Sequence, residues 1–168
     1  MAYLGYVQLT RECMQSCVFC SNPPTGVDLD LVGLCEALDR LAAMGCDGII
    51  LTGGEPTVSP LLLPAIEEAK QRGLSVRLIT NGQRLADRQL LEACVRRGLG
   101  HMHLSLYSHR REVHDAITRN AGSWERAIDC LAHGGEIGIT CDINAVISTF
   151  NCEHLHETAA WVCEQFPF

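Results

Sequence analysis

The sequence has little lysine and no long apolar segment. Lys70 is its one lysine, and no stretch of basic residues forms a stripe, so the electrostatic footprint of a general nucleic-acid-binding protein is missing. No apolar run approaches the roughly 20 residues that cross a bilayer. Residues 1–10 have neither a basic start nor a small-residue cleavage site. We therefore expect a cytoplasmic protein that binds neither membranes nor nucleic acids in general.

The chain also lacks linkers and low-complexity segments. It has 168 residues, of which 47% are hydrophobic and only 5% aromatic, and its formal net charge is −7. This length and this apolar content are typical of one globular domain with its own core. We therefore treat residues 1–168 as a single domain.

Ten cysteines are present, which in a short secreted chain would indicate a disulfide framework. This chain is too long and too rich in apolar residues to need one. Cys35, Cys94, Cys130 and Cys163 fall on expected helices, where a free cysteine behaves as a small hydrophobic residue. A reducing compartment is the better fit.

Strand and helix patterns alternate along the whole sequence. The expected strands are residues 3–10, 48–53, 75–81, 101–107 and 138–147. The expected helices are residues 31–44, 61–72, 87–97, 123–132 and 153–165. Most of the strands are apolar at nearly every position, which is typical of a sheet buried on both faces. Five strand–helix units with short connections predict an α/β fold with a parallel sheet, either open or curled into a partial (β/α) barrel.

Glycines follow four of the expected helices, at positions 45, 73, 98 and 134. Glycine adopts positive φ without steric cost, so these residues predict helix ends. Pro64 indicates that the second helix starts late or bends. The fifth strand would be an exposed apolar edge, which proteins usually avoid. We therefore expect the domain to be truncated at its C-terminus.

The segment after the first strand holds three cysteines with the spacing C-x3-C-x2-C, at Cys13, Cys17 and Cys20. Thiolates this close together select an iron–sulfur cluster or zinc. A structural zinc site normally has a fourth ligand, but the next cysteine is Cys35, on a helix, and the next histidine is His101. Three ligands on a [4Fe–4S] cluster would leave one iron open.

The spacing, with the aromatic Phe19 before the last cysteine, resembles that of the radical S-adenosylmethionine (SAM) superfamily. After the second strand comes Gly53-Gly54-Glu55-Pro56, which is similar to the GGEP motif of its MoaA and SPASM-like members. Paired glycines let the backbone approach a ligand closely, and carbonyls and a carboxylate accept hydrogen bonds from an ammonium group. The resemblance implies that this group is the amine of SAM. Without the cysteines, the motif would be an ordinary glycine turn.

The resemblance also implies roles for residues at the ends of other strands. It places Phe19 along the adenine of SAM, Ser105 at its ribose or carboxylate, and Asn144 near the ribose. Arg119 is a candidate for the SAM carboxylate through a bidentate fork, although an exposed arginine on a helix is an equally good interpretation. The tripeptide at residues 80–82, Thr-Asn-Gly, occurs at the same place in similar families but is by itself a common turn signal.

Two histidines, His101 and His103, stand two apart on the fourth strand and so point to the same face. Metal binding there is conceivable, but the pair would sit at the start of that strand, away from the cysteine segment. We expect a surface or capping role.

The function that the resemblance implies is reductive cleavage of SAM by a [4Fe–4S] cluster. The resulting 5′-deoxyadenosyl radical would abstract hydrogen from a substrate, either a peptide or a small molecule, and flavodoxin or ferredoxin would donate the electron. The family's barrel usually has six strand–helix units and we count five, which leaves activity of this chain alone open. The alternatives are an iron–sulfur or zinc module without SAM chemistry, and an inactive truncated barrel.

Overall fold

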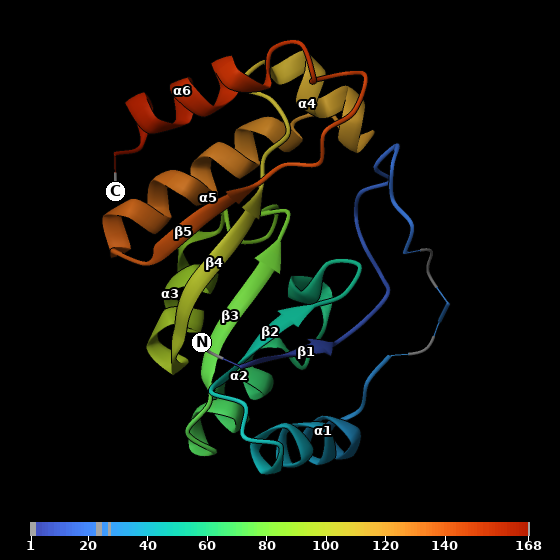
Figure 1. Ribbon diagram of the computed structural model, residues 1–168, viewed down its shortest axis with the longest axis vertical. Coiled ribbons are helices and arrows are strands. Elements are labelled where there is room, and N and C mark those ends of the chain that lie inside the picture. The colour runs from blue at the N-terminus through green and yellow to red at the C-terminus, as the bar shows by residue number, and fades with distance from the viewer. Residues whose placement is uncertain (1–2, 23–24, 27, 168) are drawn as a thin grey trace.

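Five parallel strands form one sheet in the computed structural model, which describes residues 3–22, 25–26 and 28–167 (Figure 1). Their order in the sheet is their order in the chain. The strands are β1 (Leu4–Gln8), β2 (Gly48–Thr52), β3 (Ser75–Thr80), β4 (Leu99–Ser105) and β5 (Thr140–Asn144). Because every pair is parallel, all five strands end at the same edge of the sheet. That edge is where α/β folds keep their binding sites.

Helices connect the strands. They are α1 (Leu31–Ala43), the short 3-10 helix η1 (Pro56–Val58), α2 (Leu62–Gln71), α3 (Arg88–Arg97), α4 (Arg111–Thr118), α5 (Ser123–Ile137) and α6 (Leu155–Gln165). Each of the five expected strand–helix units is therefore present. No helix in the described part of the chain is long and apolar enough to span a membrane.

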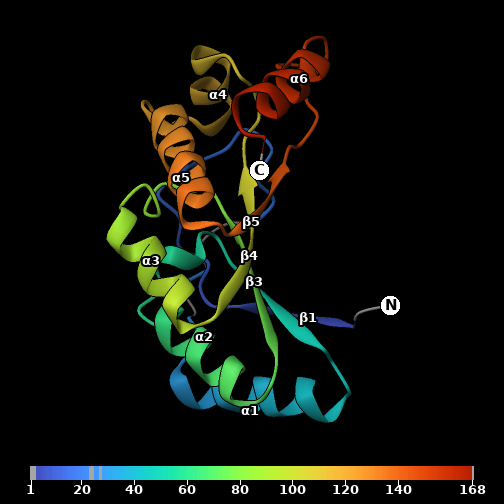
Figure 2. The ribbon, with the colours of Figure 1, turned by 90° about the vertical axis from the view of Figure 1, so that its left-hand side faces the viewer.

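One face of the sheet carries the hydrophobic core. Figure 2 shows α2, α3 and α5 stacked along this face. Alternate strand residues point toward these helices, because side chains in a strand alternate between faces. Fully buried residues on that side of the sheet include Ile49, Leu51, Leu78, Met102 and Leu104. Burial of such side chains, at about 1.5–3 kcal/mol each, is the main stabilisation of the layer.

The other face of the sheet is open, and the prediction of a sheet buried on both faces was wrong. Tyr6 is 67% exposed, and the residues of β5 alternate between exposed and partly buried. The apolar runs concealed a polar alternation: Arg77 follows Val76, and His101 and His103 flank Met102. We had expected the two histidines at the start of the fourth strand. Because β4 starts at Leu99, they lie in its middle.

Two further differences concern the helices. Residues 111–118 form α4, which is not among the expected helices. Helix α5 continues past Gly134 to Ile137, and Gly138 (φ 81°) is the residue that ends it. Gly134 is buried in that helix, where it faces Met102 and Ile139. Its lack of a side chain therefore serves packing and not termination.

Candidate functional site

The cysteines of the C-x3-C-x2-C motif lie in the segment that follows β1, at the edge where the strands end. Cys13 and Cys17 are half-buried, Cys20 is exposed, and all three are free thiols. They line one hollow together with residues 53–55. The other lining residues are Gln15, Phe19, Asn22, Thr52, Ile79, Thr80, Asn81, Ser105 and Tyr107. The motifs that the sequence singled out are therefore brought together.

The paired glycines lie against the backbone of the cysteine segment. The Gly54 N–H donates to the Thr10 carbonyl (2.9 Å), and the Glu55 N–H donates to the Glu12 carbonyl (2.8 Å). A Cβ at Gly53 would lie 2.4 Å from the Thr10 carbonyl oxygen, and one at Gly54 would lie 2.4 Å from that of Glu12. We predicted that the glycines let the backbone approach a ligand. In the structure they let two segments of the chain approach each other.

The carboxylate of Glu55 is 1% exposed and joins the ends of β2 and β3. Its Oε1 accepts from the Thr57 N–H (3.1 Å), the Thr57 hydroxyl (2.7 Å) and the Thr80 hydroxyl (2.7 Å). Among the described residues, its Oε2 accepts only from the Asn81 N–H (2.7 Å). Burial raises the pKa of Glu55, and the hydrogen bonds oppose this rise. Pro56 follows as the first residue of η1, which Glu55 caps. Since a carboxylate oxygen can accept about two hydrogen bonds, Oε2 can accept another one.

Asn81 links this corner to the cysteine segment. Its side-chain nitrogen lies 3.7 Å from the Cys13 sulfur and 3.4 Å from the Met14 sulfur. The Thr-Asn-Gly tripeptide was the signal for this residue, and the sequence analysis gave it little weight. The structure shows that its asparagine contacts a candidate ligand directly.

The C-terminal end of α4 holds the middle of the cysteine segment. The Ser16 N–H donates to the Thr118 carbonyl (3.2 Å) and the Val18 N–H to the Ile117 carbonyl (2.9 Å). The Asn120 side chain donates to the Met14 carbonyl (3.0 Å). Carbonyls in the last turn of a helix have no partner within it, so α4 offers them to the cysteine segment.

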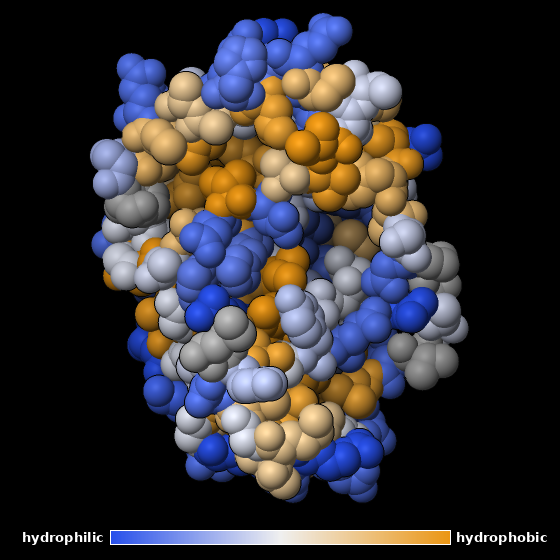
Figure 3. Space-filling view, viewed as in Figure 1, coloured by the Kyte–Doolittle hydropathy of each residue, from blue (hydrophilic) through white to orange (hydrophobic). Residues whose placement is uncertain are grey.

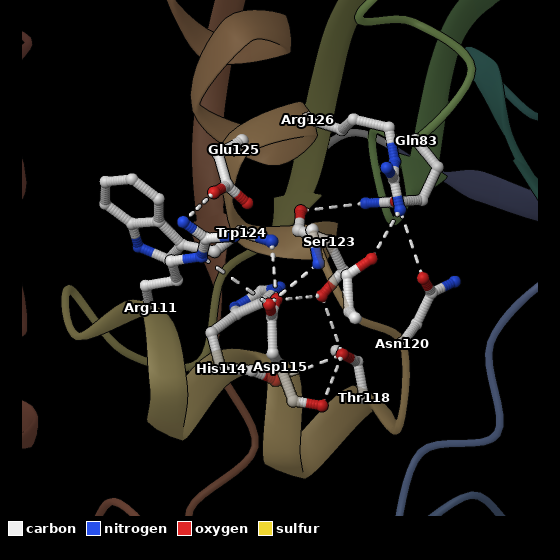
Figure 4. A network of polar contacts seen from close by, with 12 residues as sticks. Gln83, Arg111, His114, Asp115, Thr118, Asn120, Ser123, Trp124, Glu125 and Arg126 are labelled. Atoms are coloured by element: carbon white, nitrogen blue, oxygen red, sulfur yellow. Dashed lines mark hydrogen bonds and ion pairs between the residues drawn. The ribbon is translucent and has the colours of Figure 1, made fainter.

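A buried network fixes α4 against α5 (Figure 4). Gly122 precedes α5 and has no side chain to cap it, and the Asp115 carboxylate takes over this role from α4. It accepts from the Gly122 N–H (2.8 Å), the Trp124 N–H (2.9 Å) and the Ser123 hydroxyl (2.8 Å). The Ser123 and Thr118 hydroxyls are also hydrogen-bonded (2.7 Å). Burial raises the pKa of Asp115, but these hydrogen bonds outweigh burial and hold the pKa below its ordinary value.

Aromatic rings form one wall of the hollow. The Tyr107 ring packs edge-on against Phe19 (centroids 5.1 Å apart) and stacks on His114 (5.4 Å). The Tyr107 N–H donates to His114 Nδ1. Burial raises the pKa of Tyr107 to about 12, although its interaction with Ser105 opposes this. Tyr107 was not among the candidate residues, because a tyrosine at a strand end is also an ordinary core residue.

Two of these thiols, Cys13 and Cys17, have raised pKa values, which favours their protonated form. Burial, with a smaller contribution from the neighbouring Cys13 and Cys20, raises the pKa of Cys17 to about 11. Burial likewise raises the pKa of Cys13. All three cysteines line the same hollow, and ionisation of one would disfavour ionisation of the others. A bound cation would remove these protons, because the thiolate is the metal ligand.

Two candidate residues lie outside the lining of this hollow. Arg119 is exposed and ends α4 with a positive φ of 51°. Asn144, also exposed, is the Cα partner of Ser105 on the neighbouring strand. It borders a larger, mostly apolar hollow of about 600 Å³ between β5 and α6. The predicted SAM contacts of these two residues stay predictions.

The model of the radical SAM superfamily matches residues 7–162, so the chain belongs to that superfamily. Among curated proteins, it is 34% identical over 157 residues to the PqqA peptide cyclase of Ruegeria pomeroyi, a match that covers 90% of this chain and 41% of that protein. It is 28% identical over 156 residues to the AdoMet-dependent heme synthase of Methanosarcina barkeri, covering 90% and 44%.

Solved structures have the same fold. Native anSMEcpe with bound AdoMet and Kp18Cys peptide superposes with a TM-score of 0.80 at 16% identity, covering 99% of this chain and 49% of that one. SuiB of Streptococcus suis superposes with a TM-score of 0.81 at 20% identity, and the match covers 97% of this chain and 37% of SuiB. These matches confirm the predicted partial barrel. The chain spans about two fifths of the length of the curated relatives named above.

Radical SAM proteins bind a [4Fe–4S] cluster and SAM. Membership of the superfamily therefore confirms the cofactor class that the sequence predicted.

The glycine contacts lead to a first prediction. Gly54→Ala should lower the free energy of unfolding by about 1–3 kcal/mol, because its Cβ has no space beside the Glu12 carbonyl. Urea denaturation measures the change. Gly100→Ala is the matched control, since a Cβ there would lie 3.9 Å from its nearest neighbour. Equal stability of the two variants would contradict the steric argument.

The network of Figure 4 leads to a second prediction. Asp115→Ala should cost about 2–3 kcal/mol of stability at pH 7, because it removes three hydrogen bonds to an ionised acceptor. The folded-state pKa of Asp115 is lowered. This contribution is therefore complete above the unfolded-state pKa of about 3.9 and is lost as the pH falls toward the folded-state value.

Denaturant unfolding of parent and variant between pH 7 and pH 3 should show the difference shrinking on the acid side. Asp129→Ala, at an exposed position of α5, is the control and should change stability by less than about 0.5 kcal/mol. A difference for Asp115→Ala that grows on acidification would refute the assigned role.

Proposed function

We propose that this chain is the core of an enzyme that cleaves SAM reductively and uses the resulting radical to take a hydrogen atom from a peptide. The observation that carries the proposal is the hollow at the ends of the strands. It is lined by three free thiols and by the Gly-Gly-Glu turn.

The residues present fit a [4Fe–4S] cluster. Cys13, Cys17 and Cys20 supply three soft ligands on one short segment. Among the described residues that line the hollow there is no fourth cysteine and no histidine. One iron would thus keep an open coordination position, as SAM binding requires.

Polar groups around the cysteines fit SAM. Glu55 Oε2 can accept a hydrogen bond from the amine. Ser105 lines the same hollow, and Phe19 and Tyr107 offer apolar surface for the adenine. Arg119 and Asn144 are further proposed contacts, which require the bound molecule to extend beyond this hollow.

When bound, the reduced cluster supplies an electron that cleaves SAM to methionine and a 5′-deoxyadenosyl radical. The protein's part is to bind, orient and shield. Asn81 and the carbonyls of α4 fix the cysteine segment, and Glu55 fixes the turn beside it. No general base is needed for abstraction of a hydrogen atom, and we assign none. The electron would come from a donor such as flavodoxin or ferredoxin.

Cys17→Ala tests the cofactor assignment. After reconstitution with iron and sulfide, the parent protein should be brown and should form methionine and 5′-deoxyadenosine from SAM and dithionite. The variant should lose the colour and both products, because two thiolates do not hold the cluster. Iron analysis and chromatography of the products measure these outcomes.

Cys163→Ala is the matched control, since Cys163 is an exposed cysteine of α6. It does not line the cysteine hollow, by which we mean the hollow lined by Cys13, Cys17 and Cys20. It should keep both properties. A brown parent protein that forms neither product would indicate an iron–sulfur module without SAM chemistry. A colourless protein that retains zinc would overturn the cluster assignment.

The substrate class rests on the relatives. Two of the matching proteins are a peptide cyclase and a SuiB that was solved with its precursor peptide SuiA. The open face of the sheet supports this proposal, because an extended chain can lie along uncovered strands. Figure 3 shows hydrophilic surface across the middle of this face, where a peptide's polar groups would meet it.

Deuterium transfer tests the substrate class. An extract of host cells grown in heavy water is separated into a peptide fraction and a small-metabolite fraction, and each is added to the reconstituted protein with SAM and dithionite. We expect deuterium in 5′-deoxyadenosine only with the peptide fraction, as mass spectrometry would show. Deuterium from the metabolite fraction alone would refute the peptide proposal while leaving SAM cleavage intact.

A further inference from the structure

A second group of potential metal ligands lies on the open face of the sheet. His101 and His103 project from β4, and Asp142 projects from β5 as the Cα partner of His103. Asp142 Oδ2 is 2.7 Å from His101 Nε2 and 3.4 Å from His103 Nδ1. The two imidazole rings stack with their centroids 4.5 Å apart. One ligand atom from each residue lies within 4.8 Å of the others.

We propose that His101, His103 and Asp142 bind a divalent transition-metal ion of the Zn²⁺ class. Imidazole nitrogen and carboxylate oxygen bind Zn²⁺ at about 2.0–2.2 Å, so two ligands of one ion lie roughly 3 Å apart. The two distances to Asp142 Oδ2 bracket this value. Two imidazoles select a transition metal over Mg²⁺ or Ca²⁺, which prefer oxygen ligands.

An ordinary hydrogen bond between two side chains does not explain why all three residues, His101, His103 and Asp142, lie together. The bond between His101 and Asp142 is of that kind. It leaves His103, whose Nδ1 faces the same carboxylate oxygen from 3.4 Å, which is longer than an ordinary hydrogen bond. A ligand that engages both rings would explain why a second histidine lies against the pair.

Burial and charge also suit an ion with an open coordination position. The side chains of His101 and His103 are 18% and 20% exposed, whereas that of Asp142 is 58% exposed. Water can therefore complete the coordination from the side of Asp142. The carboxylate offsets part of the ion's charge. The positive charge of Arg77, the Cα partner of His101 on β3, disfavours a cation here. The affinity for the metal ion should therefore be lower than at a site with two carboxylates.

The site is separate from the cysteine hollow. None of its three residues lines that hollow, although Ser105, two residues after His103, does. Metal binding here therefore does not depend on the proposed function, and either can fail without the other.

Titration with Co²⁺ and Zn²⁺ tests the site in protein that already carries its iron–sulfur cluster. The parent should bind one ion per chain by calorimetry. The Co²⁺ form should show the visible bands of nitrogen and oxygen ligands without a thiolate charge-transfer band. His103→Ala and Asp142→Asn should weaken binding at least about tenfold, since each removes a direct ligand.

His156→Ala is the matched control, because His156 is an exposed histidine on α6; it should bind as the parent does. Asp142→Asn changes an exposed side chain, so circular dichroism and cluster content should match those of the parent. Equal binding by all four proteins, a thiolate band, or no binding by the parent would each overturn the proposal.

Discussion

The site depends on hydrogen bonds between backbone groups, which give shape to a segment without regular secondary structure. Residues 9–22 carry the three cysteines but form no helix or strand. On one side, the N–H groups of Gly54 and Glu55 hold this segment; on the other, the last carbonyls of α4 do. Every residue has backbone N–H and C=O groups, so contacts between them leave no signal in the sequence. The exception is a close approach of two segments, which requires glycine. The positions of the thiols are therefore set by residues that are not ligands.

The electrostatics of this site disfavour ionised acidic groups unless a cation is bound beside them. A buried carboxylate and three thiols line the same hollow, and burial raises the pKa of Glu55, Cys13 and Cys17. Without a metal, the least costly state is neutral thiols, because isolated buried charges are expensive. Iron binding would exchange those protons for a cation and turn the same crowding into attraction. The fold thus keeps three candidate ligands around one hollow, at an electrostatic cost that a bound metal would offset.

Much of the fold could be predicted from the sequence, and so could the centre of the site. Periodicity and helix-ending glycines placed every strand, and the cysteine spacing with the Gly-Gly-Glu turn located the hollow. Three features could not be predicted. Helix α4 is short, with one polar and one apolar side, and its main role is to support another segment. Tyr107 has an ordinary sequence context, and the turn signal around Asn81 carries little weight by itself. The open face was missed because the apolar residues at nearly every position of most strands were taken to indicate burial on both faces.

The distance along the chain between the cysteine segment and α4 has a consequence for biosynthesis. Met14 and Asn120, which are hydrogen-bonded, are 106 residues apart. A ribosome that adds about 5–20 residues per second needs roughly 5–20 s to translate that interval. During this time the nascent thiols lack the supports that later arrange them. The three thiols can therefore reach the arrangement described here only after the second half of the domain has been synthesised.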